Sequence, residues 1–445
     1  MKIAYLTAGA AGMFCGSCMN DNSVARGLME AGHDCVLAPV YTPIRTDEES
    51  VSVDRVFLGG VSVYLQQKVP LFRSLPKSAL RWLDQPWLIR GLTKNAGKTS
   101  PDLLGPLAVS MLEGVHGHQR AEFERLAEWL QSDIQPDTVL MTNLLIGGAI
   151  PELIDRLGVR VYVTLQGDDI FLDSLHSVYR QQAIERMRQL VPSIHGFIVH
   201  SQSYADFMAE MLAIPSHKLH IVPLAIRVAD FIRQRKGVDP DTGRLQSETV
   251  PSQTVASRPI TIGYLARMAP EKGLHQLTDA FIALSRNHPE RELRLRLAGW
   301  MGPQHDAYWE EQKKKLKLAK LDGRWDYAGS VDRSGKVSFL ESLDLFCVPT
   351  TYADPKGLFL LEATAVGLPY VMPDHGAFPE VHKRLQKFLP SDHGRLYRHD
   401  SVHELVRTLE ESIAENPRSI PPSSELLHEL DIETHTSRLI SVLSQ

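Results

Sequence analysis

Cysteine is scarce in this chain, with four residues among 445. So few cysteines exclude a disulfide framework and fit a reducing compartment. Cys15 and Cys18 have the spacing of a thioredoxin-type pair, but they follow a glycine-containing loop instead of lying in a thioredoxin-sized domain. No further cysteine or histidine completes a zinc site at usable spacing. We therefore expect no bound metal, and a redox role for Cys15 and Cys18 remains only a remote alternative.

Long hydrophobic runs and a strong net charge are also missing. The longest apolar candidate, Val139–Ile150, is interrupted by Thr142 and Asn143 and falls short of the ~20 residues of a membrane span. The apolar start of the chain, Lys2–Leu6, is too short for the core of a signal peptide. The net charge of −5 gives no indication of nucleic-acid binding. We therefore expect a cytoplasmic protein that does not bind nucleic acid.

Two common phosphate-binding signatures are absent as well. No P-loop pattern occurs, and Gly9, Gly12 and Gly16 do not have the spacing of the dinucleotide fingerprint. The sequence instead alternates between strand and helix patterns around small-residue loops, which is typical of a doubly wound sheet. The first such unit consists of a strand at Lys2–Leu6, a helix at Asn20–Gly32 and a strand at Cys35–Val40.

The alternation predicts two doubly wound, Rossmann-like α/β domains that face each other across a cleft. We expect them at residues 1–225 and 260–423, joined by a linker or flexible insertion at 226–259. The last residues, 424–445, are expected to include a helix that could brace the two domains. Further predicted strands are Thr138–Leu145, Arg160–Leu165, Gly196–Ser201, Lys218–Leu224, Leu293–Ala298 and Leu343–Val348, and predicted helices are Glu113–Gln131, Tyr204–Leu212, Leu274–Arg286, Tyr308–Leu321 and Lys336–Glu341.

One segment departs from the average composition. Gln66–Ser100 has seven basic residues and one acidic residue, with Phe72, Trp82 and Trp87 between them. A basic, aromatic segment could meet an anionic membrane surface, which would make the protein peripheral to the membrane, or an anionic acceptor. The alternative is a solvated helical insertion whose aromatic side chains are buried.

An anion-binding loop is predicted where the second domain begins. The segment Ile260–Gly273 starts as a strand and ends in a loop with Arg267 and Lys272, just before a helix that starts at Leu274. An Arg fork and a mobile Lys charge beside a helix N-terminus suit a diphosphate. The alternative is a solvated loop with incidental charges.

A second segment, Pro349–Pro369, strengthens the first interpretation. Asp354 lies in a loop and Glu362 in the first turns of the following helix, so that both carboxylates could face one crevice. The backbone N–H groups of Gly357, Leu358 and Phe359 lie at that helix N-terminus. Carboxylates bind sugar hydroxyls, and cations with a helix N-terminus bind phosphate, so together the two segments suggest a nucleotide-sugar site.

These motifs resemble a known family. Arg267-x4-Lys272-Gly273, followed by an acid-x7-Glu362 stretch, is similar to the donor site of the family-four retaining glycosyltransferases (group 1 type) with the GT-B fold. The resemblance is specific over residues 260–385 and holds only in outline for the N-terminal half. Further similar stretches are Ser201–Met208, Lys218–Pro223 and the base-binding loop Tyr327–Val331, which contains Gly329.

The resemblance implies roles for particular residues. Arg267 and Lys272 would hold the donor diphosphate and stabilise the leaving group, Glu362 would bind the ribose, and Asp354 would contact the sugar. The catalytic residues that the resemblance implies are Arg267, Lys272 and Asp354. Donor contacts are also implied for the backbone of Gly357, Leu358 and Phe359, for the Gly12–Gly16 loop, and for Gly329 and Val331, whereas Gln166 and Asp168 would lie on the sugar or acceptor side. The family needs no cofactor or metal beyond the nucleoside diphosphate sugar, which is a co-substrate.

Three positions depart from the family pattern. Asp354 stands where the family usually has Glu, and the shorter side chain could change the sugar or weaken catalysis. Gln166 stands where the family often has His, and Gln cannot act as an acid or base. Ala225-Ile226-Arg227 replaces the usual Gly-Ile-Asp.

The leading hypothesis is a retaining glycosyltransferase that moves a hexose from a nucleoside diphosphate sugar to an unknown glycan, lipid or small-molecule acceptor. One alternative is a nucleotide-sugar epimerase or a phosphorylase on the same fold. The other is a non-catalytic nucleotide-sugar-binding protein. The carboxyl pair Asp168 and Asp169 could in principle bind a metal, but we expect a hydrogen-bonding or helix-capping role.

Overall fold

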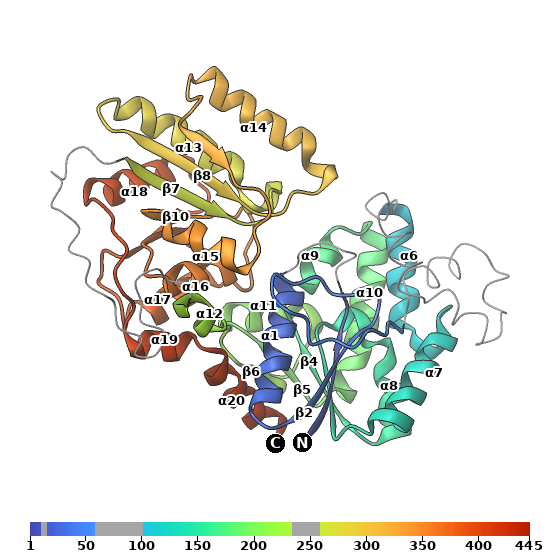
Figure 1. Cartoon of the computed structure of the whole chain (residues 1–445). Coiled ribbons are helices and arrows are strands. Elements are labelled where there is room, and N and C mark those ends of the chain that lie inside the picture. The colour runs from blue at the N-terminus through green and yellow to red at the C-terminus, as the bar shows by residue number, and fades with distance from the viewer. Residues whose placement is uncertain (10–15, 58–100, 234–258) are drawn as a thin grey trace. The chain divides into compact units, whose positions relative to one another are not determined.

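A computed structural model describes residues 1–9, 16–57, 101–233 and 259–445 (Figure 1). The chain forms two compact units. One unit consists of Met1–Pro223 together with His435–Gln445, and the other of Leu224–Thr434. Gly12, Cys15, the basic segment at 66–100 and most of the predicted linker lie outside the described residues.

The first unit is built on a six-stranded parallel sheet with the strand order β2-β1-β3-β4-β5-β6. Strands β3 and β5 are buried at every residue, because helices cover both faces of a doubly wound sheet. This explains their continuous apolar sequences. The strands are β1 (Lys2–Thr7), β2 (Asp34–Pro39), β3 (Thr138–Met141), β4 (Arg160–Thr164), β5 (Gly196–Val199) and β6 (Leu219–Ile221).

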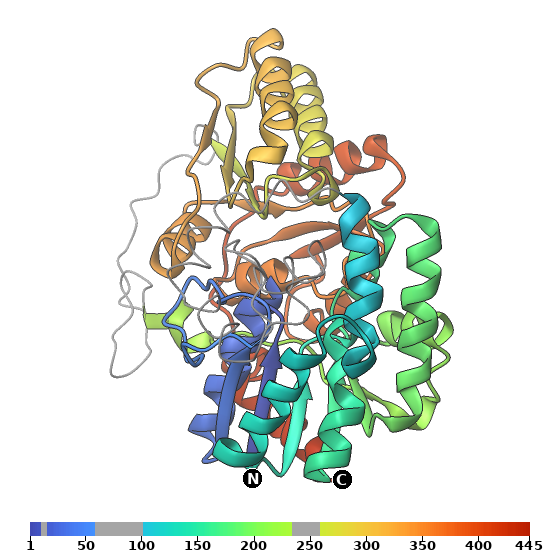
Figure 2. The same cartoon turned by 90° about the vertical axis from the view of Figure 1, so that its right-hand side faces the viewer.

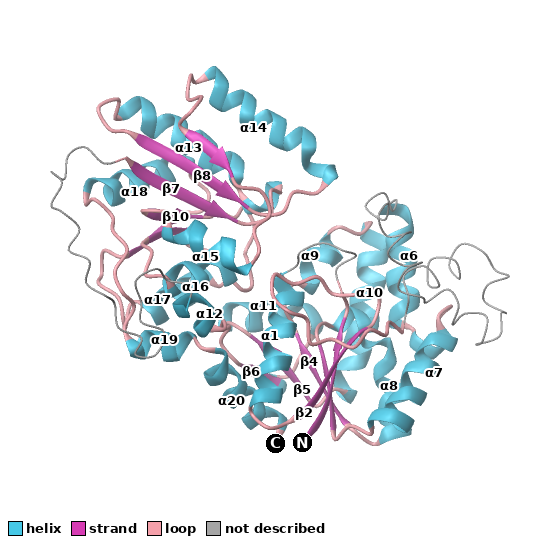
Figure 3. Cartoon of the chain, viewed as in Figure 1, coloured by secondary structure: helices cyan, strands magenta, loops and turns pink. Residues whose placement is uncertain are grey.

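Helices flank this sheet (Figure 3). Helices α6 and α10 lie side by side, as the turned view shows (Figure 2). The helices are α1 (Gly16–Glu30), α6 (Pro101–Leu112), α7 (Arg120–Trp129), α8 (Ile150–Leu157), α9 (Asp168–Asp173), α10 (Ser177–Leu190), α11 (Gln202–Leu212) and α20 (Ile432–Leu443).

The prediction of one helix over Glu113–Gln131 is wrong. A short 3-10 turn at Gly114–His116 precedes α7, and Gly114 has a φ of +59°. A Cβ on Gly114 would lie 2.0 Å from the carbonyl oxygen of Gly148. The helix is therefore broken because the chain must pass close to the Gly148 backbone in a left-handed conformation.

The second unit has its own six-stranded parallel sheet, with the order β12-β11-β10-β7-β8-β9. Its central strands are also fully buried, as at β10 and β11. The strands are β7 (Ile260–Leu265), β8 (Leu293–Ala298), β9 (Trp325–Tyr327), β10 (Leu345–Cys347), β11 (Tyr370–Pro373) and β12 (Gly394–Tyr397). The predicted α/β fold with two doubly wound sheets is thus confirmed.

Helices cover this sheet in the same way. Helices α13 and α14 lie side by side and are joined by an edge-on contact between His275 and Tyr308 (Figure 2). The helices are α12 (Val228–Arg233), α13 (Leu274–Asn287), α14 (Asp306–Leu318), α15 (Arg333–Glu341), α16 (Leu358–Ala365), α17 (Phe378–Leu385), α18 (Val402–Ala414) and α19 (Ser424–Leu430).

The predicted linker at 226–259 needs one correction. Val228–Arg233 is helix α12, and the buried side chains of Val228 and Phe231 belong to the core of the second unit. Residues 234–258 lie outside the described part. The predicted C-terminal helix is a pair, α19 and α20, which meet at Asp431 where a bridge to Ile226 interrupts them.

Candidate active site

The loop that follows β7 positions Lys272. A single 3-10 turn, Pro270–Lys272, leads into Gly273, which has a φ of +73°. A Cβ on Gly273 would lie 1.6 Å from the carbonyl oxygen of Pro349, so only glycine allows the two backbones to approach this closely. A hydrogen bond of 3.0 Å from the Thr351 N–H to the Glu271 carbonyl joins the loops that follow β7 and β10. These contacts bring Lys272 beside the loop that contains Asp354.

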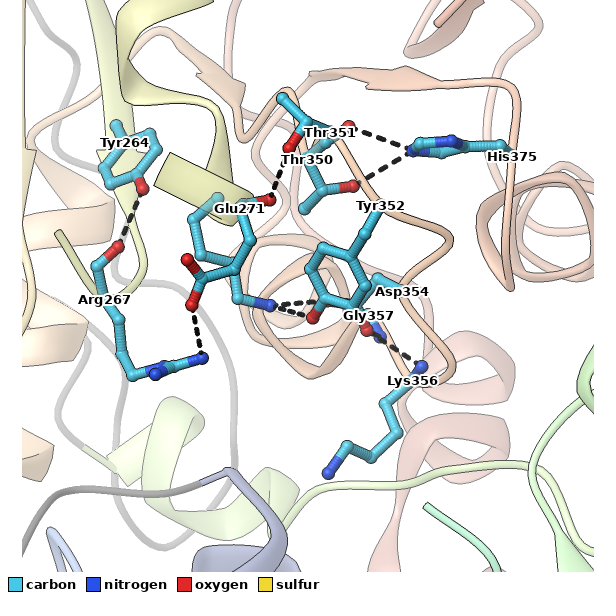
Figure 4. Close-up of polar contacts among 11 residues, drawn as sticks. Tyr264, Arg267, Glu271, Thr350, Thr351, Tyr352, Asp354, Lys356, Gly357 and His375 are labelled. Atoms are coloured by element: carbon cyan, nitrogen blue, oxygen red, sulfur yellow. Dashed lines mark hydrogen bonds and ion pairs between the residues drawn. The ribbon is translucent and has the colours of Figure 1, made fainter. Parts of the chain in front are cut away.

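Lys272 and Asp354 form a buried ion pair. The Lys272 Nζ lies 2.6 Å from Asp354 Oδ2 and 2.6 Å from the Tyr352 hydroxyl. The Tyr352 hydroxyl itself donates to Asp354 Oδ2 at 2.8 Å (Figure 4). Asp354 Oδ1 accepts from the backbone N–H groups of Lys356 at 2.9 Å and Gly357 at 3.0 Å. The carboxylate thus accepts four hydrogen bonds, which fills its usual capacity.

Burial and charge act against each other at this pair. Burial alone raises the pKa of Asp354, but the Lys272 ammonium and the hydrogen bonds outweigh it and hold the pKa well below its usual range. Burial lowers the pKa of Lys272, and the Asp354 charge opposes that shift. The Lys272 ammonium also lies over the rings of Tyr352 and Phe359, at 4.8 and 5.4 Å from their centroids. The structure therefore holds a cation in a fixed position.

Arg267 has a different partner. Its guanidinium donates to Glu271 Oε1 at 2.9 Å, and both side chains are about one-third exposed (Figure 4). The hydroxyl of Tyr264 donates to the Arg267 carbonyl and fixes the loop backbone. The Arg267 charge is close enough to oppose the protonation of Lys272. Two cations held near each other favour an anion between them.

Helix α16 begins beside the ion pair. Gly357 caps it with a φ of +66°, and a Cβ there would lie 2.9 Å from the Phe378 ring. The N–H of Gly357 is already donated to Asp354, whereas those of Leu358 and Phe359, in the first turn, have no acceptor within the helix. Of the three predicted backbone donors, Gly357 is therefore occupied by the Asp354 side chain, and the N–H groups of Leu358 and Phe359 are the ones that a ligand could use.

The loop after β11 supports Asp354 from behind. The Ala377 N–H donates to the Asp354 carbonyl at 2.8 Å, and Gly376, with a φ of +60°, lies against the Asp354 backbone. His375 Nε2 contacts the carbonyl and hydroxyl oxygens of Thr350 at 3.0 and 3.2 Å (Figure 4). The conformation of the 350–357 loop is thus set by three separate strand ends.

Glu362 and Asp354 are paired with different lysines. The Oε1 of Glu362 accepts from Lys336 Nζ of α15 at 2.6 Å, and both side chains are buried. Lys336 was not predicted as a site residue. Its spacing from Phe339 and Leu340, both buried, places it on the inward face of α15, and this helical spacing was the signal that could have revealed it.

Gly329 and Val331 follow β9 at the same edge of the sheet. The Gly329 carbonyl accepts from the Gly299 N–H at 2.9 Å, and no atom lies within 4 Å of a Cβ built on Gly329. Val331 packs partly buried against the core of the unit. Both residues therefore lie at the same edge of the sheet as Arg267 and Lys272, with β8 between their strands.

In the first unit, Gln166 and Asp168 are held by buried hydrogen bonds. Asp168 accepts from the Leu144 N–H at 2.7 Å and more weakly from the Gln166 N–H, and burial raises its pKa to about 7. The neighbouring Asp169 binds the Tyr204 hydroxyl instead. The two adjacent carboxylates therefore have separate partners, and the described residues contain no cluster of three metal-binding side chains.

The amide of Gln166 binds Asp21, a residue with no distinguishing sequence motif. Gly16 is the first residue of α1, next to the part of the loop that is not described. Cys18 is buried in the same helix, and the predicted pair with Cys15 lies partly outside the described residues.

Comparison with known proteins shows which proteins this chain resembles. Residues 246–424 match the family of glycosyl transferases group 1. Over 122 residues the chain is 28% identical to the phosphatidyl-myo-inositol mannosyltransferase of Mycobacterium tuberculosis, which is 27% of this chain and 30% of that protein. It is 31% identical over 123 residues to the glycogen synthase of the same organism, or 28% of each chain. The matched stretch spans about a third of these relatives.

Solved structures share the fold along the whole chain. Sucrose-phosphate synthase from Thermosynechococcus elongatus superposes with a TM-score of 0.67 at 14% identity, over 100% of this chain and 99% of that chain. Anabaena HepE in complex with UDP superposes with a TM-score of 0.64 at 14% identity, over 100% of both chains. Among the described residues, no helix combines the length and the apolar character that crossing a bilayer requires. Residues 246–424 therefore resemble the group 1 glycosyltransferases, and the chain as a whole has the GT-B fold of these solved structures.

Proposed function

We propose that this protein is a retaining glycosyltransferase that moves a hexose from a nucleoside diphosphate sugar to a hydroxyl group of an acceptor. The observation that carries the proposal is the Lys272 ammonium, which Asp354 and Tyr352 fix beside the first turn of α16. Two of its three N–H bonds are donated to these residues, and the third is left for a ligand oxygen. A fixed cation beside a helix N-terminus suits a phosphate.

The same cation has a catalytic use. When the bond between the sugar and the β-phosphate breaks, negative charge grows on the phosphate oxygens. Lys272 and Arg267 stabilise that charge more strongly in the transition state than in the ground state, which is what accelerates a reaction. Because they supply this positive charge, we propose that the reaction needs no metal.

Asp354 has a positioning role in this proposal. Its four acceptor positions are filled by Lys272, Tyr352 and two backbone N–H groups, so it orients the cation and the 350–357 loop. A direct contact of Asp354 with the sugar was implied only by the family resemblance. At Glu362, Lys336 binds Oε1, and Oε2 is assigned to the ribose hydroxyls.

Relatives support the nucleotide-sugar donor. Anabaena HepE has been solved with UDP and with UDP-glucose. A phosphatidyl-myo-inositol mannosyltransferase and a glycogen synthase are among the proteins to which this chain is similar. Their acceptors differ in kind, a lipid in one name and a polysaccharide in the other, so the acceptor here is proposed only as a hydroxyl compound.

A thermal-shift screen tests the donor. Ligands that bind only the native state raise the melting temperature by linkage. We expect a shift with at least one of UDP-glucose, UDP-galactose, UDP-N-acetylglucosamine and GDP-mannose, and a smaller shift with the matching nucleoside monophosphate, which lacks the second phosphate. A panel without any shift would contradict the proposal. Product analysis with the best donor then separates transfer from epimerisation or phosphorolysis.

A further inference from the structure

The first unit contains a fully buried carboxylate that the proposed mechanism does not use. Asp21 of α1 has 0% exposure. It accepts hydrogen bonds from the Tyr5 hydroxyl at 2.8 Å, the Thr7 hydroxyl at 2.7 Å, the Thr142 hydroxyl at 2.6 Å and the Gln166 amide at 2.9 Å. These donors come from β1 and from the loops after β3 and β4, at the edge of a parallel sheet where ligands bind.

This network sets the orientation of the Gln166 amide. An ionised carboxylate only accepts hydrogen bonds, so the amide NH2 of Gln166 must face Asp21. Thr142 reinforces this choice, because its hydroxyl donates to Asp21 and accepts from Gln166 Nε2 at 2.7 Å. The amide oxygen, Oε1, is therefore turned away from Asp21.

Gln166 Oε1 is buried and has no hydrogen-bond partner among the described residues. A buried acceptor that stays unpaired costs stability, which a ligand donor group would recover. Among the described residues, the ionisable groups of this network are Asp21 of α1, Tyr5 of β1 and Asp168, the first residue of α9. Two of them are carboxyl groups, so an anionic group of a ligand would be repelled at this position.

We propose that Asp21 is a positioning residue, which fixes the Gln166 amide so that Oε1 accepts a hydrogen bond from a neutral hydroxyl of the bound sugar or acceptor. The proposal rests on the proposed glycosyltransferase function and deepens it. It specifies that the ligand carries a hydroxyl at this position instead of a carboxylate or phosphate. Asp21 itself touches no ligand.

The central test substitutes Gln166→Glu and follows the pH dependence of donor turnover. When protonated, the introduced carboxyl donates its single O–H to Asp21 and still presents a carbonyl oxygen, as the amide does. When ionised, it is repelled by Asp21. We expect the ratio of variant to wild-type turnover to fall at least ~10-fold between pH 6 and pH 8. A ratio that is constant with pH overturns the proposal.

Two further variants, Asp21→Asn and Thr142→Val, test the network. We expect each to lower turnover at least ~10-fold, because each loosens the amide. Ser23→Ala is the matched control, since Ser23 is a buried residue of the same helix whose hydroxyl binds Glu48 instead. If both variants turn over within twofold of wild type, the proposal fails. If Asp21→Asn does not fold, Thr142→Val and Gln166→Glu carry the test.

Binding measurements identify the source of the hydroxyl. Calorimetry compares each variant with the nucleoside diphosphate sugar and with the nucleoside diphosphate alone. Weaker binding of only the sugar nucleotide assigns the hydroxyl to the donor sugar. Unchanged binding of both, with slower turnover, assigns it to the acceptor.

An NMR measurement separates this inference from the proposed function. The Gln166 side-chain amide, identified by its loss in Gln166→Glu, should give a shifted and slowly exchanging signal that disappears in Asp21→Asn. An unchanged signal contradicts the positioning role whether or not the protein binds a nucleotide sugar. Absence of donor binding by the wild type contradicts only the proposed function.

Discussion

Asp21 in one unit and Asp354 in the other are both buried, and each accepts four hydrogen bonds from described residues. Their pKa values nevertheless move in opposite directions. Burial raises the pKa of Asp21, and four neutral donors only partly offset it. At Asp354 the Lys272 ammonium and two backbone N–H groups reverse the effect of burial.

The difference shows that the number of hydrogen bonds does not decide in which direction the pKa of a buried carboxylate shifts. A formal positive charge within hydrogen-bond distance does, because it offsets the loss of hydration most directly. We assign the two networks different uses for the same reason. The charged one holds a cation for a phosphate, and the neutral one holds an amide for a hydroxyl.

The largest effect is expected from removing the cation that pairs with Asp354. We expect Lys272→Ala to lower donor turnover ~10²-fold or more, as for the loss of a preorganised charge stabiliser. Turnover of the folded variant is the measurement. Lys315→Ala is the control, because Lys315 also pairs with an aspartate, Asp279, but on the partly exposed surface. Near-normal turnover in Lys272→Ala would remove Lys272 from the mechanism.

A second buried pair, Lys336 with Glu362, measures how much a buried carboxylate depends on its cation. We expect Lys336→Ala to lower the free energy of unfolding by about 3–5 kcal/mol, because Glu362 is left buried and uncompensated. Denaturant unfolding measures this. The exposed pair broken in Lys315→Ala should cost about 0–1 kcal/mol, and equal losses in the two variants would show that burial of the pair is unimportant.

Asp168 is a second carboxyl group without a nearby cation: within the described part of the chain, its hydrogen-bond donors are backbone N–H groups. Its folded pKa of about 7 lies above the unfolded value, so the native state binds the extra proton. Stability from this group is therefore present at low pH and lost as the pH rises from about 4 through about 7. Between pH 5 and pH 8 the wild type should lose roughly 2–3 kcal/mol relative to Asp168→Asn. Unfolding curves at both pH values measure the difference, and a pH-independent difference would contradict the shift.

The smallest effect is expected from the neutral donor at Asp354. Tyr352→Phe removes one hydrogen bond from Asp354 and one from Lys272, but it keeps the ring beneath the ammonium. We expect a loss of about 1.5 kcal/mol in stability, typical of a hydrogen bond to a charged group, and a smaller fall in turnover than in Lys272→Ala. A fall as large as that in Lys272→Ala would mean that the hydroxyl, more than the charge, organises the site.

Much of the fold follows from local patterns. The strand at Leu293–Ala298 has the predicted bounds, and the helix that starts at Leu274 was predicted to within one residue of its end. Short or broken elements were missed or misplaced: β9 has three residues, and the helix predicted over Glu113–Gln131 is split by a glycine that packs on Gly148. Such breaks depend on what lies beside the chain, which periodicity does not record.

The sequence by itself determined the strand–helix alternation, the family resemblance and the Arg267–Lys272 loop, because each depends on residues close together in the chain. The tertiary structure determined which side chains are paired with each other. Strands β7 and β10 are neighbours in the sheet, so the loops that follow them meet and Lys272 reaches Asp354, 82 residues away.

The order β1-β3-β4 in the other sheet likewise brings Gln166 to Asp21, 145 residues away. The direction in which the pKa of a buried carboxylate shifts depends on the donors that surround it, and strand order determines which donors those are. The opposite pKa shifts of Asp21 and Asp354 therefore follow from sheet topology, although both residues were visible in the sequence.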